Sequence, residues 1–140
     1  MVLSYHDYKK KYGQEIDKGI KNLVDTLNKN GNLTMASCEG GEGHTTTYPW
    51  VAIHPSKRIN KLREQIKGFN QTDNMKWELK KEARWNPNSH SHPTIEMYYL
   101  RPLSNKMDDT DRKEKIQELA KYLYSRQLQK HRANKRLVKV

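Results

Sequence analysis

The fold is decided by residues Leu33–His54, which read LTMASCEGGEGHTTTYPWVAIH. Two runs, Leu33–Cys38 and Thr47–His54, contain β-branched and aromatic residues and flank a loop with three glycines. Short runs of this composition, bounded by glycine, are typical of strands. Because a short link joins the two runs, we expect them to pair as an antiparallel hairpin.

Helical periodicity is found on both sides of this hairpin. Apolar residues recur every three or four positions over Ser4–Asn30, over Lys57–Phe69 and after Asp109, where the stripe consists of Ile116, Leu119, Ala120 and Leu123. Alternation predicts a strand over Met75–Trp85 and a fourth over Thr94–Arg101. The order α-β-β-α-β-β-α predicts an α+β fold, with a four-stranded, largely antiparallel sheet and three helices on one face.

Composition limits the class of protein. The chain has 140 residues and one cysteine, so it has no internal disulfide framework and fits a reducing compartment. No apolar run approaches the roughly 20 residues that span a bilayer, and the N-terminus lacks the pattern of a signal peptide. We therefore expect no membrane partner and a cytoplasmic location, in the producing cell or in a host cell.

The formal net charge is +11. Between Lys121 and Val140 there are seven Lys or Arg residues and no Asp or Glu. We predict one α+β domain over residues 1–125 and a basic extension over 126–140, in which phosphates are contacted by Arg126, Lys130, Arg132, Lys135, Arg136 and Lys139. The alternative is a lysine-rich solubilising surface with a solvated tail. Aromatic residues among lysines on a sheet face can also stack bases, and Tyr98 is the candidate for an exposed ring.

The glycine loop after Cys38 holds the candidate chemistry. Glycines past a strand allow backbone N–H groups to approach a ligand, and we predict a binding loop formed by Ser37, Glu39, Gly40, Gly41, Gly43, Tyr48, His54, Lys57 and Arg58. Cys38 is a candidate nucleophile if His44 or His54 activates it. A zinc site formed by Cys38, His44, His54, His90 and His92 is another interpretation, although no cofactor is assigned. A structural hairpin loop with a small buried cysteine is the simplest alternative.

Two segments carry a resemblance to a known family. Gly19–Asn28 and Leu33–Gly40 resemble the helix and strand that precede a Ser-Cys-x-Gly motif in the wybutosine-synthesis methyltransferase-like family. Small phage and prophage proteins carry a similar Ser-Cys-Glu-Gly segment followed by a proline-led strand, here Tyr48–Ile53. The resemblance covers about residues 16–54 and points to Ser37, Cys38 and Gly40. It implies an α+β fold with an RNA- or nucleotide-related pocket beside the cysteine strand.

These observations favour a small, basic, phage-like protein that binds a nucleic acid or nucleotide through the glycine loop and the basic C-terminal segment. A second hypothesis is an inhibitor of host machinery or defence that sequesters a nucleotide signal or binds an acidic host protein. A third is an enzyme that uses Cys38 and His44 on RNA or nucleotides. The sequence does not establish that any reaction is catalysed.

Overall fold

The computed structural model describes residues 16–44, 46–72, 74–85, 94–104 and 108–138. The elements are η1 (Lys18–Ile20), α2 (Lys21–Lys29), β1 (Thr34–Cys38), β2 (Trp50–Ile53), α3 (Ile59–Asn70), β3 (Trp77–Trp85), β4 (Thr94–Pro102) and α4 (Asp109–Val138). Over the described residues, the fold is α+β with three α-helices and a four-stranded antiparallel sheet, which confirms the predicted class and element order. The part of the predicted first helix before residue 16 lies outside the described residues.

The strand order in the sheet is β1-β2-β4-β3. β1 pairs with β2 and β3 pairs with β4 as antiparallel neighbours, and β4 also pairs antiparallel with β2. The chain leaves β2, passes through α3 and enters β3 at the far edge, so β4 later fills the position between them. Val51 of β2 and Leu79 of β3 both face Leu100 of β4, which links the two hairpins through one apolar row.

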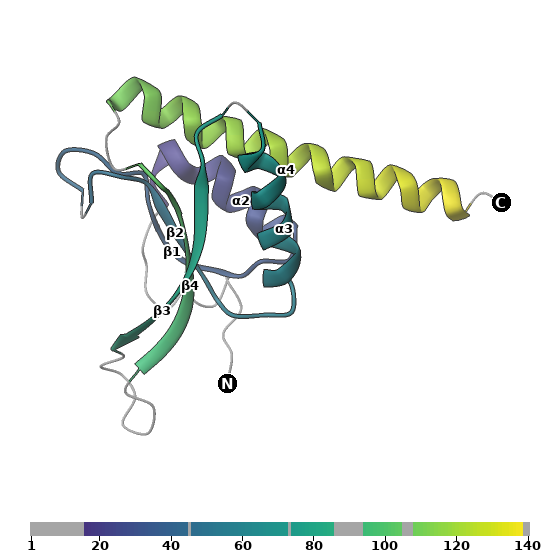
Figure 1. Cartoon of the computed structure of the whole chain (residues 1–140), viewed down its shortest axis with the longest axis horizontal. Helices are drawn as coiled ribbons and strands as arrows, with labels where there is room; N and C mark the ends of the chain where they lie inside the picture. The colour runs from purple at the N-terminus through teal and green to yellow at the C-terminus, as the bar shows by residue number, and fades with distance from the viewer. Residues whose placement is uncertain (1–15, 45, 73, 86–93, 105–107, 139–140) are drawn as a thin grey trace.

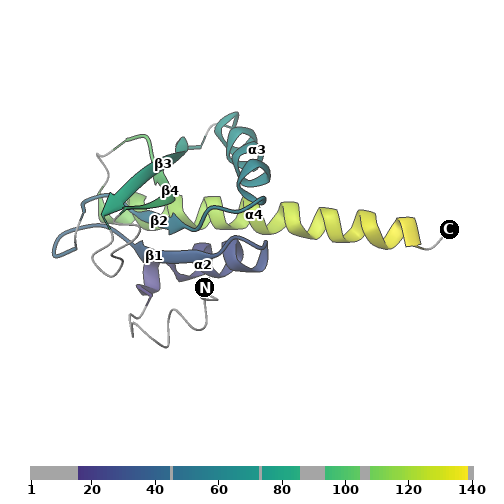
Figure 2. The same cartoon turned by 90° about the horizontal axis from the view of Figure 1, so that it is seen from below.

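The helices lie on one side of the sheet, with α4 packed against α2 and α3 (Figures 1 and 2). Their predicted apolar stripes form the core together with the sheet. Trp77 is 1% exposed and belongs to this core, as its position in the alternating strand predicts. The α2 and α4 contributions include Leu23, Leu27, Ile116, Leu119 and Leu123, all fully buried.

The cross-strand pairs show which residues lie on the sheet face that points away from the helices. Cys38 pairs with Trp50, and Ala52 pairs with Tyr99, so these residues point away from the face that carries Val51 and Leu100. The prediction that Tyr98 presents an exposed ring is wrong. Tyr98 pairs with Ile53 on the helix-covered face, packs against the core, and lies under the guanidinium of Arg63.

α4 is 30 residues long, which corresponds to about 45 Å at about 1.5 Å per residue. Its first half packs on the domain, and its C-terminal part projects well beyond the sheet and the other helices (Figures 1 and 2). Among the described side chains, Leu123 is the last α4 residue in the core cluster. Within the described residues, no helix combines the length and apolar character needed to cross a bilayer.

Candidate functional site

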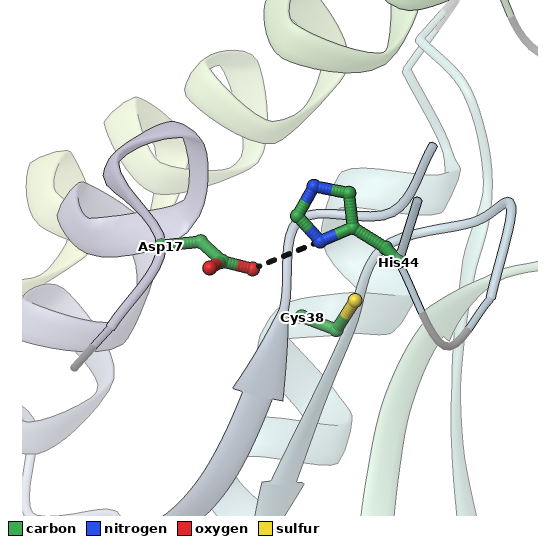
Figure 3. Close-up of side chains that lie close together, drawn as sticks. All are labelled: Asp17, Cys38 and His44. Carbon is green, nitrogen blue, oxygen red and sulfur yellow. Dashed lines mark ion pairs between the residues drawn. The ribbon is translucent and has the colours of Figure 1, made fainter. Parts of the chain in front are cut away.

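The loop between β1 and β2 folds back toward the end of β1. The N–H of Gly41 donates to the Thr46 carbonyl at 3.0 Å, and the N–H of His44 donates to the Gly41 carbonyl at 3.2 Å. Gly40, Gly41 and Gly43 have φ values of 81°, 110° and 82°, a conformation that other residues rarely adopt. These turns return the imidazole of His44 to the neighbourhood of Cys38 (Figure 3).

Three chemically different side chains meet at this point. One potential ligand atom from each of Asp17, Cys38 and His44 lies within 4.8 Å of the other two. Nδ1 of His44 is 3.5 Å from Oδ2 of Asp17, and the two side chains are 30% and 33% exposed. Cys38 is only 5% exposed, so its thiol forms the buried end of the cluster. A thiol, an imidazole and a carboxylate can together bind a metal ion or transfer protons.

Glu39 connects the members of this cluster. Its Oε1 lies 3.3 Å from Nε2 of His44, and its Oε2 accepts a hydrogen bond from the N–H of Gly19 at 2.8 Å. The N–H of Glu39 donates to Oδ2 of Asp17 at 3.1 Å, and the N–H of Gly40 donates to Sγ of Cys38 at 3.4 Å. Backbone amides therefore hold both carboxylates and the sulfur in place.

Asp17 is the member that the sequence analysis missed. It precedes η1 at the N-cap position, where an aspartate normally accepts a hydrogen bond from the first helical turn. No side-chain cap hydrogen bond forms in η1, and the carboxylate instead accepts the Glu39 N–H and faces His44. An acidic residue before a helix is a common capping signal, so nothing local in the sequence distinguishes this aspartate.

Arg112 was also missed. It lies in the first turns of α4, is 7% exposed, and donates from Nη2 to Oδ1 of Asp109 at 2.7 Å. Its guanidinium packs so closely on the loop that a Cβ at Gly41 would lie 2.5 Å from Nη2. The start of α4 therefore packs against the glycine loop at Gly41, and this contact holds the loop in position relative to the helix.

The remaining predicted loop residues fall into two groups. Tyr48 stays beside the loop, where its carbonyl accepts a hydrogen bond from Oγ1 of Thr46 at 2.6 Å. Ser37 pairs with Val51 and therefore lies on the opposite face of β1 from Cys38. These positions leave Cys38, Glu39, Gly40, Gly41, Gly43 and His44 as the connected part of the predicted loop.

His54, Lys57 and Arg58 lie elsewhere. Antiparallel pairing places Cys38 opposite Trp50, whereas the N–H of His54 donates to the Leu33 carbonyl at the other end of the hairpin. His54 lies four positions after Trp50 along the extended chain, which amounts to roughly 13 Å. The interpretation in which His54 activates Cys38 is therefore overturned, whereas the phosphate contacts predicted for Lys57 and Arg58 stay a prediction. Arg58 packs against Gly31.

Other predicted residues lie on α4 or outside the described part of the chain. The guanidinium of Arg126 stacks on the Tyr122 ring at 5.0 Å, and the helix backbone continues through Lys130, Arg132, Lys135 and Arg136. His90, His92 and Lys139 lie outside the described residues.

The sheet face near the cluster carries aromatic rings. Trp50 and Tyr99 contact each other with their centroids 6.0 Å apart and their planes tilted by 56°. Arg101 on the same face is bound by Glu78 at 2.6 Å and lies 3.4 Å from Glu82. The hydrogen bond that Nε of Arg101 donates to Oε1 of Glu78 is the main reason that the pKa of Arg101 is raised above its ordinary value. Arg101 is therefore paired with two carboxylates of the neighbouring strand β3.

We expect Gly40→Ala to damage the loop more than Gly43→Ala. Both glycines have positive φ, which costs other residues about 1–2 kcal/mol. A Cβ at Gly40 would also lie 2.5 Å from the backbone carbon of Tyr48, whereas nothing lies within 4 Å of one at Gly43. Overpacking adds about 1–3 kcal/mol at Gly40 alone. Urea denaturation of both variants measures the difference, and equal losses of stability would contradict this account of the loop.

Comparison with known proteins yields no match, whether with family models, curated proteins or solved structures.

Proposed function

We propose that the protein binds a nucleic acid, and that the C-terminal part of α4 supplies the phosphate contacts. The observation that carries this proposal is the projection of α4 beyond the domain (Figure 1). From Lys121 to the end of the chain, seven residues are cationic and none is acidic, compared with an excess of eleven cations in the whole chain. A projecting helix of this charge is accessible to a polyanion from several sides.

The distribution of ion pairs also favours the C-terminal part of α4 as the surface that contacts phosphates. Within the body, several cations already have acidic partners: Arg101 with Glu78 and Glu82, Lys81 with Glu96, and Lys115 with Glu118. Glu118 is the last acidic residue of the chain. The sequence beyond Glu118 contains seven Lys or Arg residues and no Asp or Glu, which favours phosphate contacts along this part of α4.

The sheet face opposite the described helices suits single-stranded rather than fully paired nucleic acid. Trp50 and Tyr99 are partly exposed aromatic residues on the face that no described helix covers. Unpaired bases stack on such rings, whereas the bases of a duplex are already stacked on each other. We therefore propose phosphate contacts along α4 and base stacking on Trp50 and Tyr99.

Fluorescence anisotropy with labelled single-stranded and duplex oligonucleotides tests this function on the full chain. Release of counterions predicts an affinity that falls steeply between about 50 and 200 mM salt, with tighter binding of the single-stranded probe at equal length. An affinity that is independent of salt would refute the proposal. Failure to bind either probe, together with a nuclease-resistant complex with an acidic protein, would identify protein binding as the function instead.

A further inference from the structure

We propose that Asp17, Cys38 and His44 form a binding site for a divalent transition metal, with Zn²⁺ as the best chemical match, and that Glu39 orients the histidine. This inference is independent of the proposed nucleic-acid binding. The three side chains come from three separate parts of the chain: the residue before η1, the end of β1 and the glycine loop.

The donor atoms suit zinc in type and position. Thiolate sulfur, imidazole nitrogen and carboxylate oxygen are the ligands that zinc takes in proteins. Zn–ligand bonds of about 2.0–2.3 Å in a tetrahedron place neighbouring ligand atoms about 3.3–3.8 Å apart. The three donor atoms here are within 4.8 Å of one another, and the His44–Asp17 contact is already 3.5 Å. A shift of about an ångström, within reach of a side chain on a loop, completes the geometry.

The surrounding contacts have the pattern of a metal site's outer shell. A metal-binding histidine usually donates its second ring N–H to a carboxylate, which selects the tautomer and aims the other nitrogen at the metal. Glu39 lies 3.3 Å from Nε2, leaving Nδ1 for the cluster, and the Gly19 N–H holds this carboxylate. The Glu39 and Gly40 amides donate to Asp17 and Cys38, respectively, so each proposed ligand has a positioning partner.

A metal explains the arrangement better than a cysteine nucleophile does. In a nucleophile–histidine–carboxylate triad, one ring nitrogen contacts the nucleophile and the other contacts the carboxylate. Here both nitrogens of His44 lie next to carboxylates, Asp17 at 3.5 Å and Glu39 at 3.3 Å. Two carboxylates concentrate negative charge around one imidazole beside the Cys38 thiol, and a divalent cation bound there would neutralise most of that charge.

Three protein ligands leave one position of a tetrahedral zinc ion open, as in catalytic rather than structural zinc sites. Asp17 and His44 are each about one-third exposed, so the cluster is reachable from solvent, while the thiol lies at its buried end. We therefore infer a site that holds the metal and can accept a water molecule or an external ligand.

Titration of the metal-free, reduced full chain with Co²⁺ tests the site directly. We expect one Co²⁺ per chain, with a thiolate-to-cobalt charge-transfer band and the intense visible absorption of a four-coordinate ion, both lost when Zn²⁺ is added in competition. This readout needs no variant and no assumed activity. The absence of a charge-transfer band, or weak octahedral absorption alone, would overturn the proposal.

Variants then identify the ligands. Cys38→Ser is expected to abolish the charge-transfer band. Glu39→Gln should lower the affinity for Zn²⁺ by about 10–100-fold, which is typical of an outer-shell carboxylate. His44→Gln and Asp17→Asn remove proposed ligands and should lower that affinity further. Glu42→Gln changes an exposed carboxylate of the same loop and should leave the affinity unchanged. Far-ultraviolet circular dichroism confirms that each variant is folded. Equal affinities for Glu42→Gln, His44→Gln and the unaltered chain would refute the assignment.

Discussion

Replacement of five cationic residues in the projecting part of α4 by glutamine is expected to remove most of the salt-dependent affinity for nucleic acid. The replaced residues are Arg126, Lys130, Arg132, Lys135 and Arg136. On a single strand each phosphate contact adds about 0.7 to the slope of log affinity against log salt, so five contacts give a change of roughly 130-fold between about 50 and 200 mM. The variant should show only a few-fold change. Anisotropy titrations over this range measure both slopes.

A matched control separates the position of the charges from their number. Lys21, Lys29, Lys67, Lys76 and Lys113 are exposed residues of the body and of the first turns of α4. Their replacement by glutamine lowers the net charge by the same amount but should preserve most of the salt dependence. If the two variants lose affinity equally, binding depends on overall charge and the assignment to the C-terminal part of α4 is wrong. Glutamine is a good helix former, so α4 should persist in both.

Trp77→Ala is expected to cost about 3–5 kcal/mol of unfolding free energy, the usual range for a buried tryptophan. Trp77 is 1% exposed, and its backbone N–H and carbonyl both bond to the Asn70 side chain, at 2.9 and 2.7 Å. The residue therefore joins the start of β3 to the end of α3. Since a domain is stable by about 5–15 kcal/mol, this loss is a large part of the total stability and should lower the urea midpoint of the variant markedly.

Urea denaturation followed by circular dichroism measures this loss. Lys80→Ala changes an exposed residue of the same strand and should shift stability by no more than about 0.5 kcal/mol. A midpoint for Trp77→Ala that equals that of Lys80→Ala would show that the core does not depend on the indole ring.

The fold was predictable because a helix or strand that packs on a core carries apolar residues at the regular spacing of its buried side. The stripe that contains Ile116, Leu119 and Leu123 and the alternation around Trp77 mark the same positions that form the core. Boundaries were less accurate where side chains form local hydrogen bonds. The second strand was expected from Thr47, but it begins at Trp50 because the Thr46 hydroxyl and the Gly41 amide hold the preceding residues in the loop.

The candidate site was predictable only where its members are close in sequence. Cys38 ends β1, and Glu39 and His44 follow it in the glycine loop, so the glycines between them indicate that they can meet. Asp17 and Arg112 reach the loop through the packing of η1 and α4, which no local pattern encodes. His54 is also near Cys38 in sequence, but strand register carries it to the opposite end of the hairpin.

The position of β4 has a consequence for synthesis of the protein. β4 is the last strand to leave the ribosome, yet it lies between β2 and β3 in the finished sheet. Until residue 102 emerges, β2 has β1 on one side and an unpaired edge on the other, and such edges pair readily with other chains. Nascent chains are therefore most prone to aggregate after β2 is made and before the β3–β4 hairpin docks, an interval during which a chaperone would improve the yield of folded protein.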